Sequence, residues 1–263
     1  MWIFLLGCII QARMNSKRLP GKVMMKLDDK NPSLFYTISQ LRNSKKIEKI
    51  IIATTSKTED DIIEKFANKM DVESFRGSED DVLDRFYNCA KKNNLENIIR
   101  ITADCPLIDP TIVDEMIDEF KNNNFDYVQN IEPRTFPDGM EVEIFTFKAL
   151  KEMWQNSKLP SEREHVTTYM RNKKEKFKIK KILCEKDLSK YRFTLDYSED
   201  LVLIRNIVKD INQRPILMKD IISLLTKMPE LLRINEKYEA NEGYKLSLKK
   251  DEAFLKNRKY RKD

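Results

Sequence analysis

The sequence predicts an α/β fold of three layers, in which helices cover both faces of a mostly parallel, mixed sheet, followed by a helical C-terminal appendage. The first observation is that apolar, β-rich runs alternate with helical patterns of about 10 to 15 residues, as in β-α-β units. The second is that 41% of the 263 residues are hydrophobic, which is enough for a large core. The third is that no Pro/Gly/Ser-rich linker divides the chain.

The first half of the chain supplies the regular alternation. An apolar run at residues 2–10 predicts a buried strand, and Asn31-Pro32 supplies an N-cap and a first helical position for a helix that ends near Asn43. The elements expected next are a strand at 49–54, a helix that opens at 56–61 and ends at 70, a strand at 72–75, a helix at 78–93 with Ser78 as its N-cap, a strand at 97–102 and a helix at 110–122. Parallel sheets bind ligands beyond the carboxyl ends of their strands, so the polar segments after these strands are candidate sites.

The second half of the chain is less regular. The expected strands are at 141–147, 179–184 and 191–195, and the expected helices are at 162–172, from Ser198, which should cap its helix, and from Lys219 onward. We therefore expect a main domain at residues 1–215 and a helical, basic extension at residues 216–263.

The charge distribution argues against nucleic-acid binding, although the net charge is +6. Residues 249–263 contain seven Lys/Arg and three Asp/Glu, so most of the excess lies in this tail and the preceding body is nearly neutral. The longest apolar run, residues 2–10, is much shorter than the roughly 20 residues that span a bilayer, and it lacks the features of a signal peptide. We expect a cytoplasmic protein that binds neither nucleic acid nor membranes.

Cysteine and histidine usage limits the metal sites that the chain can form. The four cysteines are widely separated and contain no C-x-x-C pair, so neither a disulfide framework nor a zinc site is indicated. His165 is the one histidine, which excludes a site built from several imidazoles. A bound metal must then be held by carboxylates, and this favours a hard ion such as Mg²⁺.

A basic loop, Gln11 to Lys22, follows the first predicted strand. It contains two arginines, two lysines and a Ser, with Pro-Gly near its end, and these groups can surround a polyphosphate. A solvated basic turn would have the same composition, and the residues alone leave both interpretations open. The sequence contains neither G-x-x-x-x-G-K-[ST] nor G-x-G-x-x-G, which disfavours P-loop ATPases, kinases and Rossmann dehydrogenases.

Four strings resemble those of the sugar cytidylyltransferases, which make CMP-activated 3-deoxy-octulosonate and nonulosonate sugars. They occur in the family's order over roughly residues 8–205: A-R-x-x-S-x-R-L-P-G-K, R-G-S-E-D-D-V-L-D-R, I-T-x-D-C-P-L-I-D and R-E-H-V-T. The chain is most similar to the spore-coat polysaccharide cytidylyltransferase-like branch. The resemblance implies a nucleotidyltransferase fold and Mg²⁺-dependent transfer of CMP from CTP to a sugar-acid-type acceptor, with release of pyrophosphate, for surface polysaccharide or glycan biosynthesis.

Two other functions remain open on the sequence. One is a cytidylyltransferase that acts on a phosphorylated small molecule and gives a CDP-linked product, which extra cationic contacts from Arg134 or Arg163 would favour. The other is a non-catalytic nucleotide-binding or assembly protein. The expected partners are CTP and a small-molecule acceptor, with a possible homodimer.

The resemblance also implies roles for individual residues. The nucleotide-binding residues are expected to be Ala12, Arg13, Ser16, Lys22, Arg76, Gly77, Ser78 and Thr102, with Arg18 as a weaker candidate. The catalytic residues are expected to be Arg13, Lys22 and Asp104. The acceptor-binding residues are expected to be Glu141, Glu143, Arg163 and His165, although an exposed strand face would explain both glutamates equally well.

Two aspartates are expected to bind the metal. Asp104 follows a buried strand and precedes a Cys-Pro turn, an arrangement that fits either a metal ligand or a turn-initiating Asp. The resemblance favours the metal ligand and gives Asp196 as the second one, since Thr194 to Leu201 is similar to the family's D-T-P-E-D-L element. Tyr197-Ser198 replaces Thr-Pro there, and Asp200 is interpreted as first-turn charge of the next helix.

Overall fold

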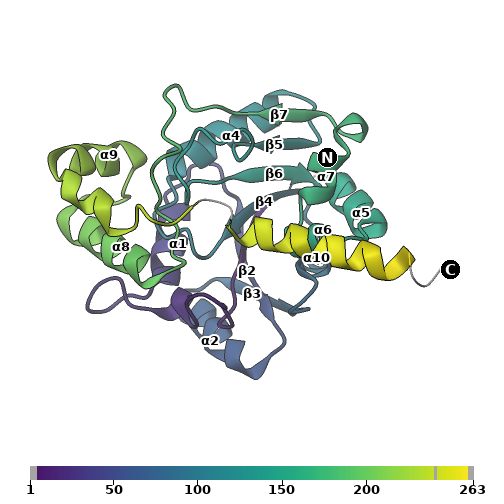
Figure 1. The fold of residues 1–263 in the computed structure, drawn as a ribbon, viewed down its shortest axis with the longest axis horizontal. Coiled ribbons are helices and arrows are strands. Elements are labelled where there is room, and N and C mark those ends of the chain that lie inside the picture. The colour runs from purple at the N-terminus through teal and green to yellow at the C-terminus, as the bar shows by residue number, and fades with distance from the viewer. Residues whose placement is uncertain (1–4, 240–241, 260–263) are drawn as a thin grey trace.

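A seven-stranded sheet forms the centre of the molecule and helices cover both of its faces (Figure 1). The computed structural model describes residues 5–239 and 242–259. Within these residues the strand order is β3-β2-β1-β4-β6-β5-β7, and β6 is antiparallel to both of its neighbours while the other neighbouring pairs are parallel. The predicted α/β class with a mostly parallel, mixed sheet is confirmed.

The strands are β1 (Leu6–Gln11), β2 (Lys49–Thr55), β3 (Glu73–Gly77), β4 (Asn97–Thr102), β5 (Tyr127–Gln129), β6 (Glu143–Thr146) and β7 (Ile179–Lys181). The helices are α1 (Ser33–Leu41), α2 (Asp61–Lys69), α3 (Val82–Lys92), α4 (Pro110–Asn122), α5 (Phe147–Asn156), α6 (Pro160–Glu164), α7 (Thr168–Asn172), α8 (Ser198–Asp210), α9 (Met218–Lys227) and α10 (Glu242–Lys259). Short 3₁₀ turns lie at Lys22–Met24, Thr58–Asp60, Lys174–Lys176 and Pro229–Ile234.

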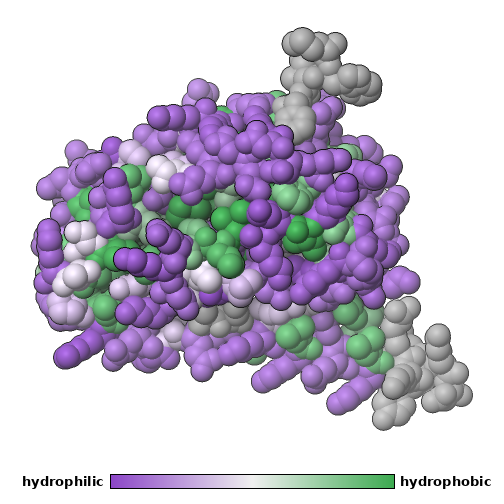
Figure 2. All heavy atoms as spheres, turned by 90° about the horizontal axis from the view of Figure 1, so that it is seen from above, coloured by the Kyte–Doolittle hydropathy of each residue, from purple (hydrophilic) through white to green (hydrophobic). Residues whose placement is uncertain are grey.

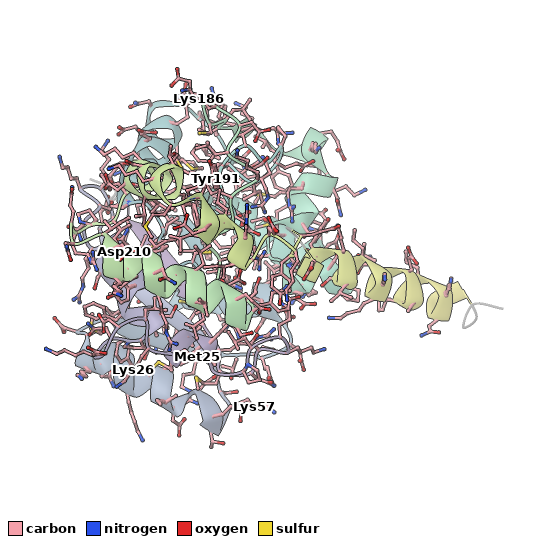
Figure 3. The ribbon with its side chains drawn as sticks, turned by 60° about the vertical axis from the view of Figure 1, so that its left-hand side comes forward. Met25, Lys26, Lys57, Lys186, Tyr191 and Asp210 are labelled. Atoms are coloured by element: carbon pink, nitrogen blue, oxygen red, sulfur yellow. The ribbon has the colours of Figure 1, made fainter. Side chains whose placement is uncertain are left out.

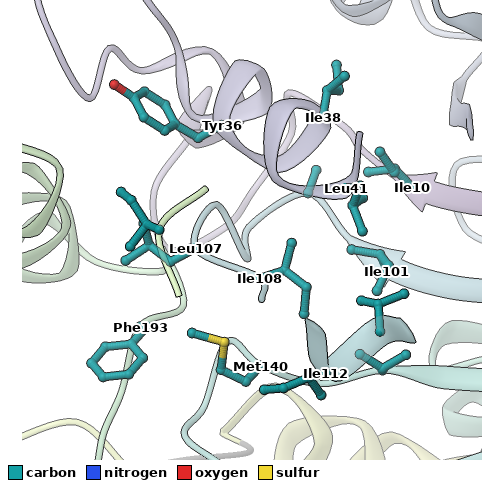
Figure 4. Close-up of a cluster of buried hydrophobic side chains, with 14 of the residues drawn as sticks. Ile10, Tyr36, Ile38, Leu41, Ile101, Leu107, Ile108, Ile112, Met140 and Phe193 are labelled. Carbon is teal, nitrogen blue, oxygen red and sulfur yellow. The ribbon is translucent and has the colours of Figure 1, made fainter. Parts of the chain in front are cut away.

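The central strands are apolar throughout because both faces of the sheet are covered. Successive side chains of β1 point to opposite faces, so Ile10 packs in one buried cluster and Ile9 in the other. The first cluster contains Ile10 and Ile101 of the sheet together with Ile38 and Leu41 of α1 (Figure 4). The outer surface is different, because polar side chains cover most of the face in Figure 2, with apolar residues in patches between them.

Several predicted boundaries are wrong because side-chain contacts replace the expected caps. The helix expected from Ser78 begins at Val82, since Asp81 is its N-cap and accepts a hydrogen bond from the Asp84 N–H (2.8 Å). Likewise, Tyr197 and not Ser198 is the N-cap of α8, and the Ser198 hydroxyl donates to Glu199 instead.

The irregular second half was predicted less well than the first. The helix expected at 162–172 is two short helices, α6 and α7, separated at Val166, whose positive φ of 58° breaks the helical path. The strand expected at 191–195 is a single bridge between Asp138 and Arg192, and β5 was not predicted.

The C-terminal segments differ in how they join the body. Ile221, Leu225 and Leu231 belong to the same buried cluster as the central strands, so the segment from α9 to residue 234 packs on the main core. The division at residues 215 and 216 stays a prediction. Across residues 5–239 and 242–259, no helix is both long enough and apolar enough to cross a membrane.

Candidate active site

Two acidic side chains meet at the carboxyl end of the sheet. Asp104 follows β4, and Asp196 precedes α8. The Leu195 N–H donates to the carbonyl oxygen of Asp104 (2.8 Å), and the Thr194 hydroxyl donates to the same oxygen (3.3 Å). These bonds place the segment that carries Asp196 beside Asp104, although the two residues are far apart in the sequence.

The Lys22 ammonium lies between the two carboxylates. Its Nζ is 2.6 Å from Asp104 Oδ2 and 2.7 Å from Asp196 Oδ1. Gly21 takes a positive φ of 73°, which lets the basic loop turn so that Lys22 reaches this position. Burial acts to lower the pKa of Lys22, but the two carboxylates outweigh it, and the pKa lies above its usual value. Burial acts to raise the pKa of Asp104, and Lys22 reverses this, lowering the pKa to about 2.

Further charged groups fix Asp196. Its Oδ1 pairs with Arg18 (2.5 Å) and its Oδ2 with Arg192 (3.0 Å). Arg192 also pairs with Asp138 (2.8 Å) and Asp200 (3.0 Å). Asp200 is fully buried, and its carboxylate accepts the backbone N–H of Asp196 (2.9 Å). The interpretation of Asp200 as first-turn charge is therefore incomplete, because it orients both Arg192 and the Asp196 backbone.

The donor set at this point is one that can hold a hard divalent ion. Two carboxylate oxygens lie within 2.7 Å of a single cationic nitrogen, so both can reach one shared cation. Among the described residues, neither this site nor any other contains a group of three or more Asp, Glu, His or Cys side chains that could hold a metal. Ligands beyond these two carboxylates would then come from water or from a bound substrate.

A first cavity of about 260 Å³ opens between the basic loop and α10. Among the described residues, six cationic side chains and two carboxylates line it, which gives an excess of positive charge. These charged residues are Arg13, Lys17, Arg18, Lys22, Arg85, Lys250, Asp104 and Glu164. The predicted nucleotide-binding residues that line it are Ala12, Arg13, Ser16, Lys22 and Thr102.

Arg85 of α3 is a lining residue that the sequence reasoning missed. Its side chain is 2% exposed, its Nη1 donates to the Ser78 carbonyl (2.9 Å), and its Nε has no hydrogen-bond partner among the described residues. No ion pair with a described carboxylate balances its charge. Burial, and then the nearby Arg13, lower the pKa of Arg85 to about 10. A buried guanidinium without a counter-ion is costly, so this side chain provides a place for a ligand anion.

The structure explains the glycine at position 77 by packing within the protein. The resemblance to the sugar cytidylyltransferases implies that Gly77 binds the nucleotide. In the structure, a Cβ at Gly77 would lie 2.9 Å from the Phe75 ring and 3.1 Å from Arg85 Cγ. Glycine therefore makes room for the stem of Arg85. One signal in the sequence could have identified Arg85 as a site residue. It is an arginine at the end of R-G-S-E-D-D-V-L-D-R that falls among the apolar positions of α3.

A second cavity of about 550 Å³ shares Asp104 with the first as a lining residue. Most of its cations are paired: Arg134 with Glu141, Arg100 with Glu143, and Lys174 with Glu132. The predicted residues Glu141, Glu143, His165 and Asp196 line it, together with Arg134 and Arg171. Cationic and anionic side chains are nearly equal in number in this cavity, whereas cations predominate in the first.

Glu143 and Arg171 have different roles in the second cavity. Glu143 is 1% exposed and accepts hydrogen bonds from Arg100, Tyr127 and Thr167, so protein side chains already engage both of its oxygens. Burial acts to raise the pKa of Glu143, but Arg100 and Arg171 lower it below its usual value. Arg171 forms no ion pair with a described residue, its Nε is buried without a partner, and the Tyr244 ring lies 5.0 Å from its guanidinium carbon. Arg171 can therefore bind a ligand anion.

His165 lies at the wall that the two cavities share. Its Nε2 is 2.9 Å from the Ser247 hydroxyl, and the Tyr244 ring meets it edge-on at 5.3 Å. Burial is the main reason that its pKa is lowered to about 4, so the imidazole is neutral near pH 7.

Four predicted residues line neither cavity in the described part of the chain. Arg76 pairs with Asp61 (2.5 Å) and Glu64 (3.1 Å), and Arg163 forks onto Asp81. Gly77 and Ser78 lie next to Arg85 without reaching the cavity surface. Ligand contacts of Arg76, Gly77, Ser78 and Arg163 stay predictions.

The comparisons with known proteins agree on one family. A family model described as cytidylyltransferase matches residues 7–242. The chain is 33% identical over 235 residues to the spore coat polysaccharide biosynthesis protein SpsF of Bacillus subtilis, covering 84% of this chain and 94% of that protein. It is 39% identical over 229 residues to the uncharacterized protein MJ1063 of Methanocaldococcus jannaschii, covering 86% and 93%.

A solved structure is similar over nearly its whole length. It is a cytidylyltransferase from Leptospira borgpetersenii serovar Hardjo-bovis, with 37% sequence identity and a TM-score of 0.85. The similarity covers 88% of this chain and 97% of that one.

Proposed function

Since the chain belongs to the cytidylyltransferase family and is a nucleotidyltransferase, we propose that it transfers CMP from CTP to a sugar-acid-type acceptor and releases pyrophosphate. The observation that carries the proposal is the convergence of Asp104 and Asp196 on one cation beside a basic cavity. The similarity to a spore coat polysaccharide biosynthesis protein supports a role in surface polysaccharide or glycan synthesis. A cytoplasmic location and a homodimer remain predictions.

We place the CTP triphosphate in the first cavity. Arg13, Ser16 and Lys22 line it, and Arg85 adds a buried guanidinium that forms no ion pair within the described part of the chain. Arginine pairs with phosphate oxygens through two parallel N–H bonds, and lysine acts as a point charge. Thr102 and Ala12 complete the lining at the ends of β4 and β1.

Asp104 and Asp196 would hold the Mg²⁺ ion, and their two carboxylates fit such an ion by chemistry and position. Bound there, the ion supplies positive charge to phosphate oxygens and can lower the pKa of an attacking hydroxyl. Lys22 would then leave its place between the carboxylates and become available to the triphosphate. Arg192 keeps its contact with the other oxygen of Asp196 and holds that side chain in place.

The proposed reaction is an in-line displacement at the α-phosphorus of CTP. An acceptor oxygen forms the new bond to phosphorus, and the bond to the oxygen that bridges the α- and β-phosphates breaks. Charge accumulates on the departing pyrophosphate, where Arg13, Lys22 and Arg85 stabilise it more than they stabilise bound CTP. Positioning and charge carry most of such a reaction.

We place the acceptor in the second cavity, next to Asp104. A sugar acid offers hydroxyls and one carboxylate, and the cavity offers Glu141 for hydroxyls and Arg171 for the carboxylate. Arg171 would serve a phosphate equally well, so a phosphorylated acceptor that gives a CDP-linked product is the second candidate.

Pyrophosphate release tests both candidates. Purified protein is incubated with CTP and Mg²⁺, with 3-deoxy-manno-octulosonate, with glycerol 3-phosphate, or with no acceptor. We expect release that depends on the sugar acid and is slower when ATP, GTP or UTP replaces CTP. Release with glycerol 3-phosphate alone would move the assignment to the second candidate. A protein that neither binds CTP in calorimetry nor releases pyrophosphate would overturn both.

A further inference from the structure

Helix α10 lies outside the region that the family model matches. The match ends at residue 242, where this 18-residue helix begins. In Figure 1 it runs beside α6, and in Figure 3 its C-terminal part extends well beyond the body of the molecule. The N-terminal part is therefore docked on the body, while the C-terminal part projects from it.

Polar contacts with α6 and His165 fix how α10 is rotated about its own axis. The Ser161 N–H and hydroxyl both donate to Asp251 (2.8 and 2.5 Å), and Lys250 pairs with Glu164 (2.7 Å). The Ser247 hydroxyl also donates to Glu164 (2.9 Å) and contacts His165. Ser247 and Asp251 are 1% and 7% exposed, so the hydrogen bonds of these two side chains are shielded from water and directional.

In this orientation one face of α10 points toward the first cavity. Gly243, Leu246, Ser247 and Lys250 all line it, and their spacing of three, four and seven residues is that of a single helix face. Leu246 is 57% exposed although it lines the first cavity, so part of its apolar surface is accessible to a ligand in that cavity. Gly243 at the first turn has no side chain to narrow the opening.

We propose that this face of α10 is the outer wall of the nucleotide site, where Leu246 covers the bound nucleoside triphosphate and Lys250 adds a positive charge. The inference rests on the proposed function, which places CTP in the first cavity. It assigns nucleotide contacts to a helix beyond the family's matched region. Leu246 loses water-exposed apolar surface when the nucleotide enters, and Lys250 raises the positive potential at the cavity mouth.

The helix itself offers matched control positions. Leu255 is an exposed leucine (50%) on the projecting part, and it lines neither cavity. Lys249 is an exposed lysine next to Lys250 that also lines neither cavity. Leu246→Ser and Leu255→Ser change helix propensity and surface hydrophobicity equally, and Lys250→Met and Lys249→Met change net charge equally. A difference between the two leucine variants then reflects the cavity, and a difference between the two lysine variants reflects the cavity together with the loss of the Lys250–Glu164 ion pair.

Calorimetric titration of CTP and of pyrophosphate into wild-type protein and these four variants tests the proposal. We expect Leu246→Ser to weaken CTP about five- to tenfold, a loss that persists in 0.5 M salt because it is apolar, and to leave pyrophosphate affinity unchanged. We expect Lys250→Met to weaken CTP about two- to fivefold at low salt, an effect that salt removes. Both control variants should match the wild type within twofold.

Two outcomes separate this inference from the proposed function. If wild-type protein binds CTP and Leu246→Ser behaves like Leu255→Ser, α10 is not a wall of the site, while the proposed function stands. If wild-type protein does not bind CTP at all, the proposed function fails first. Hydrogen exchange adds a structural readout: CTP should slow amide exchange at residues 243–250 and leave residues 253–257 unchanged, and equal exchange with and without CTP would overturn the proposal.

Discussion

The two cavities beside Asp104 differ in how their charges are balanced. Among the described residues, the first has six cationic side chains against two carboxylates, whereas the second has six against seven. In the first, Arg85 is buried, and it forms no ion pair with any carboxylate of the described residues. In the second, Arg100, Arg134 and Lys174 are each paired within the protein.

This difference separates the ligands that each cavity suits. An excess of cations around a small volume favours a polyanion, and it costs stability until the polyanion binds. A cavity of balanced pairs favours a ligand with many hydroxyls and little charge, because its hydrogen-bonding groups are already oriented. Arg171 is the exception in the second cavity, and one such cation suits a ligand with about one anionic group.

The largest effect is expected at Asp104, which lines both cavities. Asp104→Asn removes one of the two carboxylates that converge on the shared cation position. We expect pyrophosphate release to fall about 10²- to 10³-fold, the range found when one electrostatic contact that stabilises a transition state is lost. The thermal midpoint should change little. Asp118→Asn, at an exposed aspartate paired with Lys46, is the control, and equal activity of the two variants would remove Asp104 from the mechanism.

The next effect is expected at Arg85 and sharpens the assignment of the first cavity. Arg85→Met removes a buried charge that ligand oxygens would otherwise satisfy. We expect CTP and pyrophosphate affinities to fall about 10- to 100-fold in calorimetry, and the ligand-free protein to be at least as stable as the wild type. Arg205→Met, at an exposed arginine, is the control. A variant that is less stable and binds CTP normally would show that Arg85 is purely structural.

A smaller effect is expected at Arg171 in the second cavity. Arg171→Met should raise KM for an anionic acceptor about tenfold and leave the Kd for CTP unchanged, because one charge-assisted contact is lost. Lys176→Met, on the exposed turn after α7, controls for net charge. If CTP affinity falls and acceptor KM does not, the assignment of ligands to the two cavities is reversed.

The smallest effect concerns His165, whose neutral ring leaves the charge of both cavities unchanged. In the unfolded chain the imidazole takes up a proton near pH 6.5, whereas burial lowers its pKa in the folded protein to about 4. The charge of Glu164 opposes this shift, and the charges of Arg100, Arg171 and Lys250 add to it. Between these values the unfolded chain binds more protons, so folding stability falls as the pH falls, by about 1–3 kcal/mol. Urea unfolding at pH 7 and pH 5 measures this. His165→Gln should flatten the dependence, and an unchanged slope would contradict the shift.

Local signals explain what the sequence predicted well. Helix α4 was predicted at its observed bounds because Asp109 accepts the Thr111 N–H (2.7 Å) and Pro110 occupies the first position, both visible in the sequence. The position of Asp104 at the end of β4 follows from one apolar run and one polar turn. Such features depend on neighbouring residues alone.

Features that depend on distant partners were missed. Arg85 and Arg171 matter because no described carboxylate pairs with them, and Asp200 matters because Arg192 and Asn235 both donate to it. The break between α6 and α7 at Val166 accompanies packing of Val166 into a fully buried position. None of these relationships can be deduced from spacing.

The contact of Lys22 with Asp104 and Asp196 has a consequence for handling the protein. Because Lys22 pairs with both acids, and Arg18 and Arg192 also pair with Asp196, we expect the protein without nucleotide to keep its fold in the absence of a divalent ion. Chelators should therefore leave its melting temperature unchanged, and they should matter once the nucleotide draws the lysine away. Divalent ions and nucleotide should accordingly bind more tightly together than either does alone.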